Sequence, residues 1–151
     1  MKKKSQRLKV IIELQLLQEQ EALQALGRCQ QKFQELLTQL EGLQNYRLEY
    51  QANLTKKQAL GMGISQLLEF RAFAEKLDKA IEGQNLSLKI QEQELQRAQS
   101  YWEESRQRMK SLQKVSDLAL AEELKIENRR EQLEQDARAA RGAKKDGIGN
   151  A

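Results

Sequence analysis

Few residues in this chain of 151 could do chemistry. It contains no histidine and a single cysteine, Cys29, so Ser-His and Cys-His nucleophile pairs and histidine metal sites cannot be built. Gly61-Met62-Gly63 lacks the Lys-Ser/Thr ending of a phosphate-binding loop. Glu103 and Glu104 lie beside arginines, which predicts a solvated, charge-balanced face. The sequence therefore predicts a protein that is not an enzyme and has no cofactor or metal.

The elements that must position the remaining residues are long helices. The chain has no proline, and proline is the residue that most strongly interrupts a helix. In the first half, Leu26, Phe33, Leu40 and Leu54 recur in steps of seven, with the polar Arg47 between them. In the second half the same step gives Leu67, Ala74, Ile81, Leu88, Leu95, Trp102 and Met109, and the pattern weakens beyond Met109. Such heptads are typical of helices that pack along a narrow seam.

Between the two heptad regions, Gly61-Met62-Gly63 predicts a turn, because glycine can end a helix in the left-handed conformation. Ser65 could cap the next helix. We expect an all-α, two-helix antiparallel coiled-coil hairpin over 1–141, with arms at about 5–60 and 66–140 and a turn at about 61–65. Residues 142–151 are expected to form a flexible tail. Counting back from the turn leaves the second arm unpaired from about Asp117 onward.

The charge pattern limits the partners. The net charge is +4, and much of the excess lies near the two ends of the chain. Along the arms both signs alternate and no aromatic-plus-arginine platform appears, so nucleic-acid binding is not expected. The sequence shows neither a signal peptide nor an apolar run of the roughly 20 residues that cross a bilayer, which predicts a cytoplasmic protein without a transmembrane segment. A single cysteine fits a reducing compartment.

The aromatic residues gather near the turn. Tyr50 and Phe70 fall on the predicted seam, where they could plug the end of the hairpin. Tyr46 and Phe73 fall beside the seam, where partial exposure would favour a docking patch. The sequence leaves both interpretations open.

The same residues carry a family resemblance. Asn45 to Leu54 (NYRLEYQANL), Phe70-x-x-Phe73 followed by Leu77-Asp78, and Tyr101-Trp102 before a basic run resemble the FliJ family of the bacterial flagellar type III protein export apparatus. The likeness spans about residues 7 to 141. It implies a hairpin similar to the gamma or stalk subunit of rotary ATPases.

The resemblance also implies partners and contact residues. It implies a stalk-like adaptor, monomeric alone and peripheral at the inner membrane, that binds the hexameric export ATPase, the export-gate component FlhA and export chaperones. Gate docking maps onto Gln39, Leu43, Tyr46, Tyr50, Phe73, Leu77, Ala80 and Gln84. Contact with the ATPase ring maps onto Lys3, Lys4, Arg7, Lys9, Arg129, Arg130, Arg138 and Arg141.

Two other functions fit the same sequence. One is the stalk protein of a virulence-type injectisome, which shares the fold. The other is a generic dimeric coiled-coil scaffold, in which the glycine break is bridged by a two-chain rod.

Overall fold

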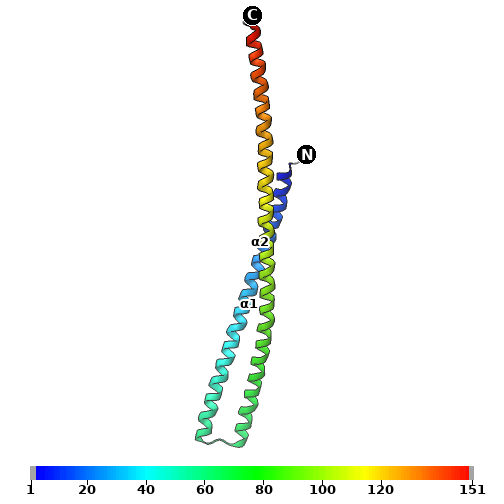
Figure 1. Cartoon of the computed structure of the whole chain (residues 1–151). Helices are drawn as coiled ribbons and strands as arrows, with labels where there is room; N and C mark the ends of the chain where they lie inside the picture. The colour runs from blue at the N-terminus through cyan, green and yellow to red at the C-terminus, as the bar shows by residue number, and fades with distance from the viewer. Residues whose placement is uncertain (1–2, 150–151) are drawn as a thin grey trace. The chain divides into compact units, whose positions relative to one another are not determined.

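The fold consists of two helices. The computed structural model describes the backbone of residues 3–149 and the side chains of residues 3–144. Helix α1 spans Lys4–Leu60 and α2 spans Ile64–Gly149 (Figure 1), and the described residues contain no strand. The predicted all-α helical hairpin is therefore confirmed. Contacts divide the chain into two units, residues 20–104 and residues 1–19 with 105–151.

The turn is a three-residue connection. Gly61 has a φ of 95° and donates its backbone N–H to the Gln58 carbonyl oxygen at 3.3 Å, which ends α1. The Gly63 carbonyl oxygen accepts the N–H of Leu67 at 3.1 Å, so Gly63 precedes the first turn of α2. Ser65, which the sequence suggested as the cap, lies inside α2 instead. The helix begins before it because Gly63 can end the turn without a capping side chain.

The unit of residues 20–104 contains the turn and the two arms that it joins (Figure 1). Its seam buries Leu26, Leu40 and Leu54 from α1 and Ala74 and Leu77 from α2. Leu26, Leu40, Leu54 and Ala74 are positions of the predicted heptads, and Leu77 lies three residues after Ala74 on the same side of α2. Burial of these apolar residues from both arms holds the pair together.

Polar residues also cross the seam of this unit. The Gln91 side chain is 3% exposed, and its Nε2 donates to the Cys29 carbonyl oxygen at 3.5 Å. A buried amide is tolerated because it finds an acceptor on the facing backbone. Cys29 itself is half-buried and its thiol is free.

The second unit pairs the first turns of α1 with the second half of α2 (Figure 1). Its buried residues are small: Ser5, Ser105, Ser116 and Ala119. The heptad pattern predicted a seam that weakens beyond Met109, but the seam continues to Glu123, which contacts Ser5. Small and polar residues keep the same heptad spacing there, although they carry no hydrophobic periodicity.

The unpaired part of α2 consequently begins later than predicted. Every residue from Leu124 to Lys144 is exposed, so the boundary lies at Leu124 and not at Asp117. The helix continues to Gly149, past Gly142, where the flexible tail was expected to begin. Residues 150–151 lie outside the described part of the chain, and the flexibility of 142–151 stays a prediction.

Candidate docking surfaces

The eight residues assigned to gate docking form one surface of the unit of residues 20–104. Each arm supplies four of them with the same spacing of four, three and four residues. This spacing alternates between the edge of the seam and the flank beside it, so the four side chains of each arm follow one side of their helix. We call this surface the aromatic stripe; its members are Gln39, Leu43, Tyr46 and Tyr50 of α1 and Phe73, Leu77, Ala80 and Gln84 of α2.

Contacts at both ends of the aromatic stripe show that the two arms join there. At the end nearer the turn, the ring centroids of Tyr50 and Phe73 lie 4.9 Å apart. At the other end, Gln84 Nε2 donates to Gln39 Oε1 at 3.0 Å and to the Leu36 carbonyl oxygen at 3.3 Å. The antiparallel register thus brings the first residue of one set beside the last residue of the other. The stripe is a continuous surface of both helices.

The aromatic rings pack on one another. The ring centroid of Tyr46 lies 6.4 Å from that of Tyr50 and 6.3 Å from that of Phe73, with the Tyr46 and Phe73 rings in a T-shaped arrangement. Tyr50 stacks on Phe70 with their centroids 5.0 Å apart. Lys57 places its ammonium 4.8 Å from the Phe70 ring. These distances are within the range of favourable aromatic and cation–π contacts. The cluster closes the seam and also reaches the surface, so the plug and the docking patch are compatible, and docking stays a prediction.

Exposure divides the aromatic stripe into supporting and accessible members. Leu77 is buried, and Leu43, Tyr50 and Gln84 are half-buried. Partial burial raises the pKa of Tyr50 above its ordinary value, and nearby Tyr46 and Glu69 raise it further. Tyr46 is 47% and Phe73 39% exposed, and Gln39 and Ala80 are also exposed. Tyr46 and Phe73 therefore carry the large rings of the aromatic stripe that are accessible to solvent.

The basic residues assigned to the ATPase ring lie in the other unit and are less concentrated. All eight are exposed. Lys3 and Arg130 line one shallow depression together with Glu123, Ile126 and Glu127. Arg138 and Arg141 follow Glu123 at a distance of roughly 22 to 27 Å along the helix, at 1.5 Å per residue. Lys3 and Arg130 thus line the same depression, whereas Arg138 and Arg141 lie farther along α2.

Acidic residues alternate with the basic ones on this part of α2. Glu131, Glu134 and Asp136 lie between the arginines that the family resemblance assigns to the ring contact, and Glu127 lies just before them. The uncovered part of α2 is therefore a mixed-charge surface. The four positive residues at and just before the start of α1, Lys3, Lys4, Arg7 and Lys9, are the denser group.

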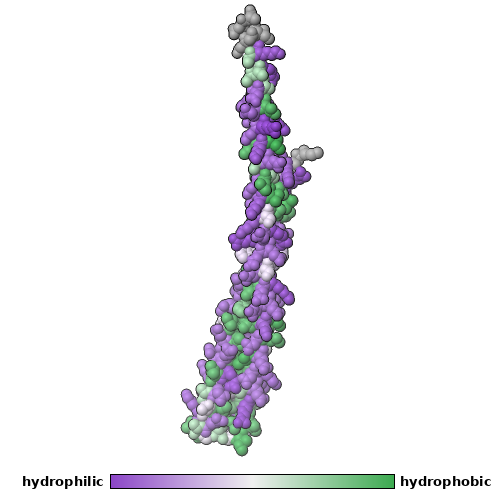
Figure 2. Space-filling model, in the orientation of Figure 1, coloured by the Kyte–Doolittle hydropathy of each residue, from purple (hydrophilic) through white to green (hydrophobic). Residues whose placement is uncertain are grey.

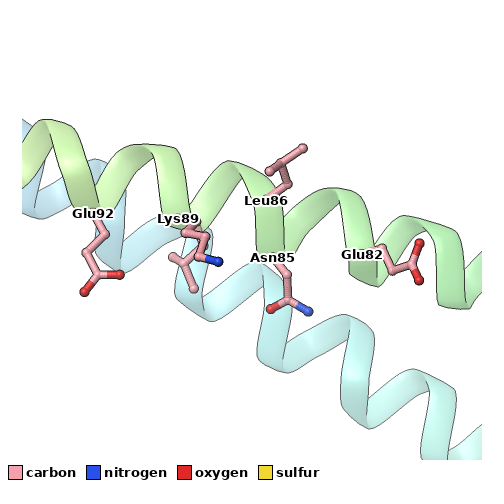
Figure 3. A pocket seen from close by; sticks show the side chains of 6 residues that line it. Glu82, Asn85, Leu86, Lys89 and Glu92 are labelled. Atoms are coloured by element: carbon pink, nitrogen blue, oxygen red, sulfur yellow. The ribbon is translucent and has the colours of Figure 1, made fainter.

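Depressions in the surface are shallow. The one in Figure 3 is lined by α2 alone, with Glu82, Asn85, Leu86, Lys89 and Glu92 along one side of the helix.

Within the described residues, no group of three or more cysteines and carboxylates could hold a metal ion. No helix in the same part of the chain is long and apolar enough to cross a membrane.

We call the unit that pairs the first turns of α1 with the second half of α2 the N-terminal unit. One of its features was not predicted from the sequence: a set of exposed apolar residues that includes Val10, Leu14 and Leu17. The sequence signal that could have revealed it is the stretch from Leu8 to Leu17, where seven of ten residues are apolar. A single seam uses only three or four positions in that length.

Two long helices joined by a three-residue turn define a class of protein, the all-α helical hairpins. Comparison with known proteins specifies the family. The model of a family described as Flagellar FliJ protein matches residues 3–147. The Flagellar FliJ protein of Salmonella typhi is 32% identical over 123 residues, which cover 82% of this chain and 84% of that protein. The Flagellar FliJ protein of Escherichia coli (strain K12) is 28% identical over 124 residues, with the same coverage. The chain belongs to the FliJ family.

Proposed function

We propose that this protein is a non-enzymatic adaptor of the flagellar protein export apparatus, located in the cytoplasm and peripheral at the inner membrane. It docks on the export gate component FlhA through the aromatic stripe and on the export ATPase hexamer through the unit that pairs the first turns of α1 with the second half of α2. It also escorts export chaperones, and so supports flagellum assembly and motility.

The observation that carries the gate-docking proposal is the convergence of eight residues on one surface. They come from two segments more than twenty residues apart in sequence, yet the register joins them along a single side of the hairpin. Within that surface, Tyr46 and Phe73 present exposed aromatic rings supported by half-buried neighbours. Large, supported aromatic side chains contribute most to binding at protein interfaces.

The ring-docking proposal is supported by the placement of residues 3–19 and 105–149 in one unit. Every residue of α2 from Leu124 to Lys144 is exposed, and Lys3, just before α1, lines a depression with Ile126, Glu127 and Arg130 at the base of this segment. A ring with a central opening can receive one helix more readily than a broad domain. Basic residues at the base add attraction toward an acidic rim.

Substitution of the two exposed rings tests the gate-docking proposal. We expect Tyr46→Ala with Phe73→Ala to weaken binding to the purified cytosolic domain of FlhA by at least about 30-fold, a typical loss for interface hot spots. Helicity by circular dichroism and stimulation of ATPase activity should stay close to those of the unchanged protein. Tyr101→Ala is the matched control, because Tyr101 is equally exposed and lies outside the aromatic stripe. Equal loss of binding, helicity and stimulation would assign the rings to stability alone.

A further inference from the structure

In the N-terminal unit the first turns of α1 are apolar on almost every side. Between Leu8 and Leu17, the half-buried Leu8 and Ile12 take seam positions. Five further apolar residues of this stretch are exposed by 41% to 59%: Val10, Ile11, Leu14, Leu16 and Leu17. Heptad spacing places Val10 and Leu17 directly opposite the seam, Ile11 and Leu14 on one flank and Leu16 on the other.

Helix α2 also exposes large apolar residues in the same unit, while its seam positions hold small ones. Its seam positions hold the buried Ser116 and Ala119, while Val115, Leu118, Leu120 and Leu124 are exposed. Leu118 is 71% exposed. Small residues inside and large apolar residues outside are the reverse of what a freely solvated helix pair requires. Figure 2 shows hydrophobic surface where the first turns of α1 run along α2.

We define the apolar collar as the nine exposed residues Val10, Ile11, Leu14, Leu16, Leu17, Val115, Leu118, Leu120 and Leu124. A helix that is apolar all round is normally buried, and clustered exposed apolar residues mark interaction surfaces. Because the collar faces away from the seam on both helices, a partner on one side alone would leave part of it in water. A flat lipid surface would likewise cover one side of the collar and leave the other side in water.

We propose that the apolar collar is the contact surface for a protein that encloses the helix pair in a sleeve lined with apolar side chains. The inference rests on the proposed function, in which the export ATPase hexamer supplies a ring-shaped partner. Apolar contact, rather than charge attraction, then supplies most of the affinity between the helix pair and the ring. The collar holds the complex together, while Lys3, Lys4, Arg7 and Lys9 act on the approach of the two proteins.

Three variants of the full chain separate these roles. The first, Val10→Ser with Leu14→Ser and Leu17→Ser, removes three of the five collar residues of α1. The second, Val115→Ser with Leu118→Ser, removes two of the four collar residues of α2. The third, Lys4→Gln with Arg7→Gln, removes charge only. All of these side chains are exposed, so circular dichroism should show folded helices in each variant. Binding to the purified ATPase ring is measured at low and high salt.

We expect each collar variant to lose at least tenfold in affinity, chiefly through faster dissociation. The charge variant should keep the dissociation rate and lose association rate at low salt only, since exposed charges are screened by salt. Full binding by either collar variant would overturn the enclosing sleeve. Loss of affinity in the charge variant alone, with unchanged binding of both collar variants, would overturn the apolar contact.

Ring binding and molecular mass of the unchanged protein complete the test. Failure of the unchanged protein to bind the ring would overturn the proposed ring docking and, with it, this inference. Light scattering that gives a two-chain mass for the unchanged protein and a one-chain mass for both collar variants would assign the collar to a second copy, and would overturn the enclosing partner. Normal ring binding by a one-chain protein, lost in both collar variants, supports the inference.

Discussion

Ser5 and Glu123 close the paired part of the N-terminal unit, although 118 residues separate them in sequence. The Ser5 hydroxyl donates to Glu123 Oε2 at 2.6 Å, and the Ser5 backbone N–H donates to Oε1 at 3.2 Å. This N–H belongs to the first turn of α1 and has no carbonyl partner within its own helix. A carboxylate at that end also interacts favourably with the positive end of the helix dipole. Glu123 thus acts as a cap supplied by the other helix.

This pair should make the start of α1 sensitive to acid. The hydrogen bond from the Ser5 side chain, followed by that from its backbone, lowers the pKa of Glu123 below its ordinary value of 4.5. A lowered pKa in the folded state means that the stabilisation is complete above the ordinary value and is lost as the pH falls through the lowered one. We expect the amide protection of residues 8–15, measured by hydrogen exchange and corrected for intrinsic rates, to fall several-fold across that range.

Variants of the pair provide the controls. Glu123→Gln should show the reduced protection at neutral pH and no further change with acid, and Ser5→Ala should reduce it in part. Glu122→Gln removes a neighbouring exposed carboxylate and should leave protection unchanged. An acid-induced loss that persists in Glu123→Gln would assign the effect to another group.

The fold could be predicted from the sequence because its determinants are local and repetitive. Leu26, Leu40 and Leu54 are large, evenly spaced and buried as expected, and a glycine with positive φ ends α1 where the heptads stop. Hydrophobic periodicity reports such positions directly. It cannot report Ser5, Ser116 or Glu123, which occupy the same seam without being apolar. The paired region therefore extends beyond the predicted boundary.

The candidate sites were predictable in a different degree. Once the register is fixed, heptad spacing alone places the members of the aromatic stripe on one side of the hairpin. Spacing also places Phe73 beside the seam and Leu77 on it, in agreement with their exposure of 39% and 8%. It does not show that the Phe73 ring packs on Tyr46 and Tyr50, because this depends on the side-chain conformations. The apolar collar was missed for a related reason. An apolar residue on a helix pattern is assigned to the core by default, and the interior of this pair has room for few of them.

Arg47 occupies a seam position between Leu40 and Leu54, where its guanidinium reaches out to Asp78. Nε lies 2.8 Å from Asp78 Oδ1, with the two side chains 25% and 57% exposed. A solvent-exposed ion pair contributes about 0.2 to 1 kcal/mol. A leucine would instead bury apolar area against its neighbours at about 25 cal/mol per Å². We expect Arg47→Leu to raise the free energy of unfolding by about 1 kcal/mol, and Asp78→Ala to lower it by less than about 1 kcal/mol.

Urea denaturation of the two variants and of the double variant measures both effects. Arg71→Leu serves as the control, since Arg71 is exposed and lies off the seam. Its free energy of unfolding should stay within about 0.5 kcal/mol of the unchanged protein. Destabilisation by Arg47→Leu larger than that by Asp78→Ala would show that the ion pair contributes more than apolar packing at this position.

The glycines Gly61 and Gly83 should respond to alanine in opposite directions. Gly83 lies inside α2, where an added Cβ would meet no atom within 4 Å. Alanine favours a helix over glycine by about 1 kcal/mol, so Gly83→Ala should stabilise the protein by about that amount. Gly61 also has open space, but its φ of 95° is strained for any residue with a Cβ. Gly61→Ala should therefore cost about 1 to 2 kcal/mol.

Thermal unfolding followed by circular dichroism compares the two substitutions. Gly42→Ala repeats the Gly83 test on the other arm, because Gly42 also lies within a helix with open space around its Cα. Both helical variants should melt at higher temperature than the unchanged protein, and Gly61→Ala at lower temperature. A lower melting temperature for Gly83→Ala and Gly42→Ala would mean that these glycines serve a close approach between chains, because the single chain offers no clash to explain it.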